Sequence, residues 1–187
     1  FDDFETFSGW TTQGNGAVSQ DNTRVKFGSY SAHKTTDSDP NGAYKSIGQT
    51  LGRDIILEAW VNRNSGYTGG GTDRIGLIDA TGDGYGWAFT QGSDSLDVDE
   101  RSSFTGTISD SATVTGRMDE WIFARHEIRS DGNLINNTVY YNGVYQGSTS
   151  KADTTHNSFT HVYIFGGYDY WVDDMRVRPY ADTSISV

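Results

Sequence analysis

Short runs in which apolar and polar residues alternate recur along the chain. In residues 55–62, Ile, Leu, Ala and Val occupy every second position, with Ile, Glu, Trp and Asn between them. Successive side chains of a β-strand point to opposite faces, so this run predicts a strand with one apolar face and one mixed face. The same alternation appears in residues 75–77, 85–89, 96–99, 121–129, 137–143, 161–167 and 170–179.

Long helices are not expected. No stretch of more than ten residues places apolar side chains at three-and-four spacing between capping residues. The alternating runs are separated instead by turn sequences rich in Gly, Asn and Asp, namely DPNG, GYTGGG, ATGDG, SDGN and YYNGVY. Many short strands joined by tight turns predict an all-β, antiparallel β-sandwich or barrel.

The composition favours one folded domain. The chain has 187 residues, of which 34% are hydrophobic, yet it carries 5 Trp, 11 Tyr and 9 Phe. A modest apolar share with many aromatic residues predicts a core built from large rings. The length suits a single domain, which we place at residues 1–180, with residues 181–187 as a C-terminal tail or linker.

Charge narrows the classes of partner. The formal net charge is −11 at pH 7, and the sequence contains no Cys. An acidic protein repels phosphate backbones, so nucleic acid is not expected as a partner. No run approaches the roughly 18 apolar residues that cross a bilayer, so membrane insertion is not expected either.

Several segments together resemble one group of folds. DIILEAWVNR, DEWIFARHEIRSDGNLINNTVYYNGVYQGS and VYIFGGYDYWVDDMRVRPYA are similar to strands of concanavalin A-like, laminin-G-like domains. FDDFETFSGWT with GSYSA resembles the opening of jelly-roll carbohydrate-binding modules. The resemblance implies an antiparallel β-sandwich of jelly-roll type. Since this fold hosts lectins, hydrolases, lyases and adhesion domains, it does not fix the function.

No catalytic residues are assigned. Asp97, Asp99 and Glu100 of DVDER, and Arg125 and Glu127 of ARHEIR, are the closest approach to paired catalytic carboxylates. The Glu-x-Asp-x-x-Glu pattern of laminarinase-like hydrolases and the companion His and Tyr motifs of lyases are not recognisable. A solvated ladder of charges across neighbouring strands explains these residues more simply.

A sugar site needs an exposed aromatic ring beside carboxylate, amide or guanidinium groups, because sugars have apolar faces and hydroxyl rims. Trp60 shares the mixed face of its strand with Glu58 and Asn62. Neighbouring strands are expected to add Arg125, Glu127, Tyr140 and Tyr163 to this face. Tyr85 and Trp87 form a second candidate platform. The alternative for each Trp is that it belongs to the core.

Calcium is a candidate cofactor, since it takes six to eight oxygen ligands. Asp37, Asp39 and Asn41 match the first half of a calcium loop, although a plain Asp/Asn-rich turn explains them equally well. In the last strand, alternation with Met175 and Val177 places Asp173 inward or at the edge of the core, where a carboxylate needs a partner.

The resemblance implies a second calcium site. In jelly-roll binding modules an early Glu and a closing-strand Asp often hold a structural calcium ion. Glu5 and Asp173 are the matching residues, with Asp3 nearby. The alternative is that Asp173 accepts hydrogen bonds from the backbone or from an Arg.

These observations favour a non-catalytic, extracellular or cell-surface, lectin-like module that binds a polysaccharide or glycan and belongs to a larger secreted or surface protein. A structural or adhesive domain of a surface layer, filament or virion, packed against neighbouring domains, is the second hypothesis. A polysaccharide hydrolase or lyase on the same fold is the third.

Overall fold

The computed structural model describes residues 1–15, 18–35, 41–66, 72–90, 95–113, 118–152, 155–167 and 169–180. All regular secondary structure in these ranges is β-strand. Within them no helix has the length and apolar character needed to cross a membrane. The all-β prediction is confirmed.

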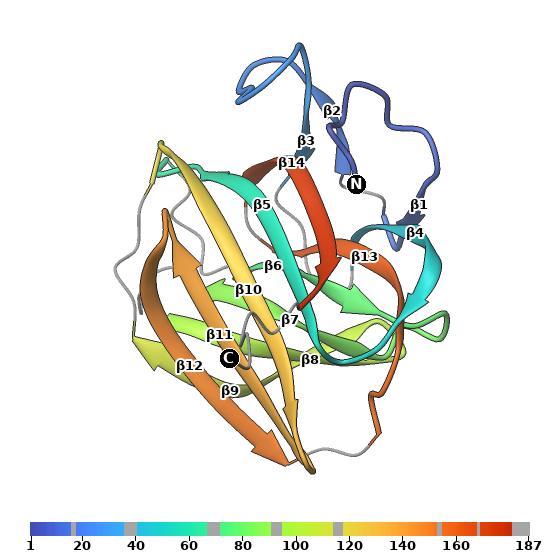
Figure 1. Ribbon diagram of the computed structural model, residues 1–187. Helices are drawn as coiled ribbons and strands as arrows, with labels where there is room; N and C mark the ends of the chain where they lie inside the picture. The colour runs from blue at the N-terminus through green and yellow to red at the C-terminus, as the bar shows by residue number, and fades with distance from the viewer. Residues whose placement is uncertain are drawn as a thin grey trace, which may run out of the picture.

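The strands form two seven-stranded antiparallel sheets, with one lying in front of the other in Figure 1. The front sheet has the order β12 (Val144–Ala152), β11 (Leu134–Tyr141), β10 (Trp121–Asp131), β5 (Ile55–Arg63), β14 (Tyr170–Pro179), β3 (Ser31–Lys34) and β2 (Val18–Asp21). The back sheet has the order β1 (Trp10–Gln13), β4 (Gly42–Leu51), β13 (Phe159–Gly166), β6 (Thr72–Ile78), β7 (Gly84–Thr90), β8 (Ser95–Ser102) and β9 (Thr105–Thr113).

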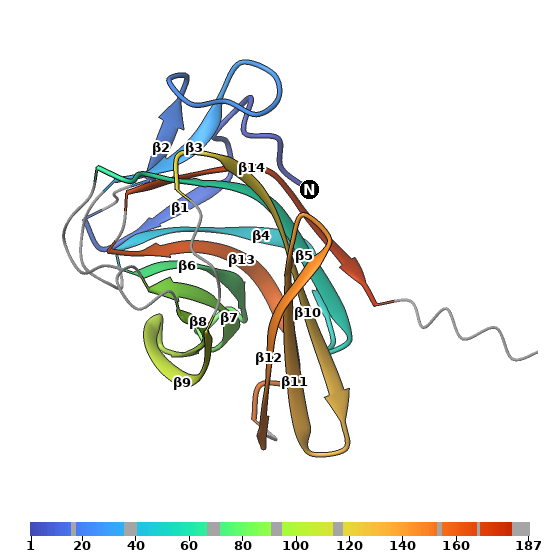
Figure 2. The same cartoon turned by 90° about the vertical axis from the view of Figure 1, so that its left-hand side faces the viewer.

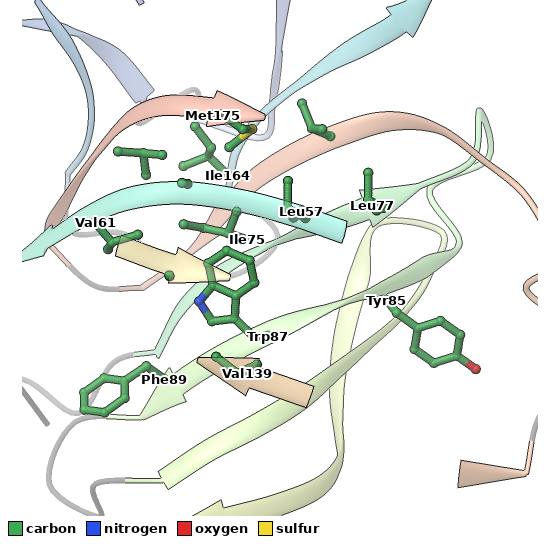
Figure 3. Close-up of a cluster of buried hydrophobic side chains, with 14 of the residues drawn as sticks. Leu57, Val61, Ile75, Leu77, Tyr85, Trp87, Phe89, Val139, Ile164 and Met175 are labelled. Atoms are coloured by element: carbon green, nitrogen blue, oxygen red, sulfur yellow. The ribbon is translucent and has the colours of Figure 1, made fainter. Parts of the chain in front are cut away.

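The core lies between the two sheets and is built from the apolar halves of the alternating runs (Figure 3). Leu57 and Val61 of β5 face Ile75 of β6 and Trp87 of β7, and all four side chains are buried. Burial of this apolar area, at about 25 cal/mol per Å², is the main source of stability for such a sandwich.

The two sheets are connected at both sides of the sandwich. On one side β12 of the front sheet packs beside β9 of the back sheet. On the other, Asp2 pairs with Met175 of β14 through two backbone hydrogen bonds of 3.0 and 2.8 Å. The Asp2 carboxylate also accepts hydrogen bonds from Trp10 Nε1 (2.8 Å) and from Lys45 Nζ (2.6 Å) of β4. The N-terminal segment therefore holds β14 against β1 and β4 (Figure 2).

The outer face of the back sheet carries a buried cluster formed by its own side chains. Tyr163, Phe165 and Ile78 form a second apolar cluster there, and all three are fully buried. A Cβ at Gly86 of β7 would lie 2.1 Å from the Tyr163 hydroxyl, so only glycine allows this ring to lie flat on the sheet. We call this group, together with Asp99 and Arg101 of β8, the back-face cluster.

A β-bulge changes the direction of side chains in β14. The pairing with β5 shifts between Asp173 and Arg176, and Asp174 has a φ of 45°. One extra residue reverses the alternation beyond the bulge. Asp173 therefore lies on the outer side, opposite Trp60, whereas Met175 lies in the core. The prediction that Asp173 shares the inward face of Met175 is wrong for this reason.

Candidate functional site

The outer face of the front sheet carries polar and aromatic side chains that stand on neighbouring strands. Arg125 of β10 lies opposite Glu58 of β5 on one side and opposite Tyr140 of β11 on the other. Directly opposed residues of antiparallel strands have Cβ atoms about 4.5–5.5 Å apart. The register of three strands thus brings together three side chains that the sequence assigned to one face.

These side chains line a hollow of about 340 Å³, which we call the central hollow. Its lining consists of Glu58, Phe123, Arg125, Glu127, Tyr140 and Gly143. Four of these six residues were predicted ligand-binding residues. Phe123 was not predicted as a site residue, although the alternation of β10 places it on this face. Gly143 was not predicted either; it lies in the turn between β11 and β12.

Two nearly buried carboxylates form the floor of the central hollow, and each has an arginine partner. Glu127 Oε1 lies 2.5 Å from a terminal nitrogen of Arg125, and Glu58 accepts two hydrogen bonds from Arg178, of 3.0 and 3.4 Å. Arg125 Nε lies 3.9 Å from Glu58 Oε1. Pairing offsets much of the cost of removing these charges from water. The carboxylates are thereby held as hydrogen-bond acceptors at fixed positions.

Tyr140 supplies an aromatic wall with a polar end. Burial and the negative charge of Glu127 raise the pKa of the Tyr140 hydroxyl above its ordinary value. The hydroxyl therefore stays protonated at neutral pH and can donate a hydrogen bond. The Arg125 guanidinium lies 5.7 Å from the centroid of the same ring, within cation–π range.

Trp60 lies where the sequence placed it, but its ring is covered. Lys26 Nζ lies 3.9 Å from the ring centroid, and Phe27 and Phe123 approach at 5.9 and 5.3 Å. Lys26 and Phe27 belong to the segment that connects β2 to β3, residues 22–30, which we call the 22–30 loop. The half-buried Trp60 therefore stands beside Phe123 with the Lys26 ammonium over its ring.

The 22–30 loop is held by two acidic residues through its backbone. Asp173 Oδ2 accepts hydrogen bonds from the amides of Lys26 (2.9 Å) and Phe27 (3.0 Å). Glu5 Oε1 accepts them from the amides of Ser29 (2.6 Å) and Tyr30 (3.1 Å). Burial raises the pKa of Asp173, against the effect of these bonds. The backbone hydrogen bonds expected as the alternative explanation of Asp173 are present.

The calcium candidates that the structure describes are Asp3, Glu5, Asn41 and Asp173. Within the described ranges, no three His, Cys, Asp or Glu side chains are arranged to hold a metal ion. Asp3 Oδ1 accepts a 3.2 Å hydrogen bond from the Glu5 amide, and Asn41 Oδ1 accepts one of 2.8 Å from the Asn15 amide. Asp37 and Asp39 lie outside the described residues. A calcium ion at Glu5 and Asp173 would compete with backbone amides for the same oxygens.

Asn62 belongs to another hollow, of about 630 Å³, at the end of the front sheet next to the 22–30 loop. We call it the loop-side hollow. The Asn62 carboxamide oxygen accepts a 2.7 Å hydrogen bond from Arg24, and the residue is 5% exposed. Its lining includes the polar and aromatic residues Arg24, Asn62, Asn64, Ser65, Asp119 and Trp121.

The second predicted platform is wrong. Tyr85 and Trp87 are 0% and 1% exposed, and the Trp87 ring meets His126 edge-on with centroids 5.6 Å apart inside the sandwich. Alternation correctly placed both residues on one face of β7, but that face is the core.

Tyr163 is also misassigned. It lies on β13 of the back sheet, fully buried, and donates a 2.8 Å hydrogen bond to Asp99. Alternation cannot tell which sheet a strand joins, so the pattern held no signal that would have separated Tyr163 from Tyr140.

Comparison with known sequences gives one informative relative. No protein-family model matches the chain. The chain is 36% identical over 184 residues to an uncharacterized protein, MJ1394, of Methanocaldococcus jannaschii. The match covers 95% of this chain and 19% of the relative, so the chain spans about a fifth of the length of that curated relative.

Solved structures give the fold. The carbohydrate-binding module CBM66 from Bacillus subtilis aligns with a TM-score of 0.66 at 12% identity over 91% of this chain and 95% of that one. Cellulose induced protein, Cip1, aligns with 0.66 at 17% identity over 95% of both chains. The Caenorhabditis elegans galectin LEC-6 aligns with 0.54 at 13% identity over 78% of this chain and 95% of that one. The protein thus has the antiparallel jelly-roll β-sandwich fold of these proteins.

Proposed function

We propose that the chain is a non-catalytic, lectin-like module that binds a glycan in the central hollow. One observation carries the proposal. The strand register gathers Glu58, Arg125, Glu127 and Tyr140 around a single hollow on an outer sheet face. These residues are also the ones that the alternation of the sequence predicts for a sugar site.

The chemistry of the central hollow suits a sugar. Carboxylates accept hydrogen bonds from hydroxyl groups, a guanidinium donates to them, and these charge-assisted bonds are the strong ones. Phe123 and Tyr140 can pack against the apolar face of a sugar ring. The hollow of about 340 Å³ is within the size range of small-ligand sites. Solved carbohydrate-binding modules and galectins of the same fold support this proposal.

We also propose that the module works outside the cell or at its surface as one part of a longer polypeptide. Its match to 19% of a longer relative supports the second point. The net charge of −11 supports a glycan rather than a nucleic acid as partner. The alternative, an adhesive domain packed against neighbouring domains, differs in requiring no glycan.

The test is a glycan array followed by affinity electrophoresis on the polysaccharides that bind. Glu127→Gln and Tyr140→Ala should each weaken binding about tenfold or more, because each removes a hydrogen-bonding group from the hollow. Tyr30→Ala is the matched control, since Tyr30 is exposed and lies outside the hollow.

Two outcomes would overturn the proposal. No binding across the array would favour the adhesive domain. Release of reducing ends from a polysaccharide, lost in Glu127→Gln, would reveal an enzyme and contradict the non-catalytic part.

A structural calcium ion stays a separate prediction. An ion that binds the folded chain but not the unfolded chain raises the melting temperature. If calcium is bound, a chelator should therefore lower the melting temperature. Glu5→Gln would remove the effect if the ion binds at Glu5 and Asp173, and Asp39→Asn would remove it if the ion binds at residues 37–41. An unchanged melting temperature after chelation would contradict both positions.

A further inference from the structure

The outward side chains of β10 connect the central hollow to a hollow on either side. Trp121 lines the loop-side hollow, and Phe123 and Arg125 line the central hollow. Glu127 lines both the central hollow and a third hollow of about 480 Å³, where Arg129 follows it. We call the third one the far-end hollow. Every second residue of one strand thus serves a row of three hollows.

The row is long and follows a single strand, β10. From Trp121 to Arg129 the strand advances eight residues, or about 26 Å at about 3.3 Å per residue. The central and far-end hollows adjoin, because both are lined by Glu127 and Tyr140. The loop-side hollow comes next along the strand, because Trp121 in its lining stands two residues before Phe123 on the same face of β10. A single monosaccharide would fill only a part of this length.

The loop-side hollow is built like the central one. Arg24 donates hydrogen bonds of 2.7 Å to Asn62 Oδ1 and of 2.8 Å to Asp119 Oδ1, and its guanidinium lies 4.3 Å from the centroid of the Trp171 ring. Hydrogen bonds from the Ser65 hydroxyl and from Arg24 lower the pKa of Asp119, so this carboxylate stays an acceptor. The half-buried Trp121 stands beside them as an aromatic wall.

The charges along the row are paired. Asp119 pairs with Arg24, Glu58 with Arg178, and Glu127 with Arg125. The far-end hollow adds one charge of each sign, Arg129 and Asp131. The row therefore offers many hydrogen-bonding groups with little net charge, on a molecule whose formal charge is −11. A polyanionic ligand needs an excess of positive charge at its binding site, and the described residues of the row supply none. A neutral chain rich in hydroxyl groups can form hydrogen bonds with the donors and acceptors along the row.

We propose that the ligand is an extended, linear, neutral glycan that lies along β10 and occupies the loop-side, central and far-end hollows together. Trp121 is then the aromatic residue of the outermost subsite, about 7 Å along the strand from Phe123. This inference rests on the proposed glycan binding and adds the ligand's length, direction and charge.

The experiment measures dissociation constants by titration calorimetry for ladders of neutral oligosaccharides built from glucose, xylose, mannose or fructose units, from disaccharide to octasaccharide. For the ladder that binds, affinity should rise with each added unit until the row is filled. Trp121→Ala should weaken binding of the longest oligosaccharide about two- to tenfold and leave the disaccharide unchanged, while Tyr140→Ala should weaken all lengths. Trp121→Phe should restore most of the loss.

The outcomes separate this inference from the function on which it rests. Binding that is complete with a disaccharide and insensitive to Trp121→Ala would leave glycan binding intact and overturn the extended ligand. Affinity that falls steeply with added salt, or that appears only with uronic acid chains, would overturn the neutral ligand. Failure of every ladder and every polysaccharide would overturn the proposed function itself. Equal melting temperatures of the variants and the wild type confirm that each effect arises in binding.

Discussion

The two outer faces of the sandwich carry the same kinds of residue, but on the back face they form a buried cluster and on the front face they line an accessible hollow. On the back face, Asp99 accepts hydrogen bonds from Arg74 (2.7 Å), Arg101 (2.8 Å) and Tyr163 (2.8 Å). On the front face, the Glu127 carboxylate is paired with Arg125 beside Tyr140. Asp99 and Arg101 are fully buried, whereas the Arg125 side chain is 36% exposed. The comparison teaches that residue types alone do not distinguish a structural cluster from a binding site.

Small residues beneath the cluster explain the difference. On the back sheet, Gly76 and Gly86 leave room for the Tyr163 ring, whose hydroxyl would lie 2.6 and 2.1 Å from a Cβ at these positions. Arg101 then stacks over Tyr163 and Phe165, at 4.8 and 4.6 Å from the ring centroids. On the front sheet the corresponding outward positions carry large side chains such as Trp60 and Glu58, and hollows remain between them.

The largest expected effect tests the structural half of this comparison. Asp99→Ala removes the acceptor shared by Arg74, Arg101 and Tyr163, and breaking a buried charge pair costs about 3–5 kcal/mol. We expect urea denaturation to give a free energy of unfolding lower by that amount, with glycan binding by the remaining folded protein unchanged. If the variant is too unstable to purify, Asp99→Asn gives the milder form of the same test. A loss below about 1 kcal/mol would contradict a structural role.

An intermediate effect is expected from the inward side of β10. Burial lowers the pKa of His126 to about 4, whereas an unfolded chain would protonate this side chain near pH 6.5. Between these values the unfolded state binds more protons, so the free energy of unfolding should fall by about 3 kcal/mol as the pH falls from 6.5 to 4. His126→Gln should flatten this dependence. NMR titration should find the imidazole neutral at pH 5; a protonated ring at that pH would disprove the shift.

The smallest expected effect on stability is that of a substitution in the central hollow. Glu127→Ala leaves Arg125 open to water, and a partly exposed pair contributes about 1 kcal/mol or less. The same change should abolish most of the glycan affinity, so that stability and binding respond oppositely at Glu127 and Asp99. A thermal shift assay with a binding titration checks both. A loss of several kcal/mol at Glu127 would make the two faces alike.

Much of the front face could be predicted from the sequence because its strands keep strict alternation. The runs that became β5, β10 and β11 each place one set of side chains outward, and Glu58, Arg125, Glu127 and Tyr140 followed from that rule alone. The resemblance of several segments to jelly-roll domains predicted the antiparallel β-sandwich. Their meeting at one hollow also required β5, β10 and β11 to be direct neighbours, which alternation alone does not predict.

The errors arose where alternation needed information from elsewhere in the chain. At Asp173 a β-bulge reversed the pattern, and no turn residue in the sequence marks it. At Trp87 the pattern identified one face of the strand but not the side of the sheet that the partner sheet would cover. At Trp60 the cover comes from Lys26 and Phe27, more than thirty positions away in the sequence. Each of these depends on contacts between distant segments.

The attachment of the 22–30 loop has a consequence for how recognition can change. Glu5 and Asp173 hold this loop only through main-chain amides, so their hold does not depend on the side chains at positions 26 and 27. Gly28, with a φ of 68° and with the Glu5 carboxylate 2.1 Å from where its Cβ would stand, is the fixed point. The rim above Trp60 and beside Trp121 is accordingly a place where evolution or a randomised library can rewrite ligand preference while the scaffold stays folded.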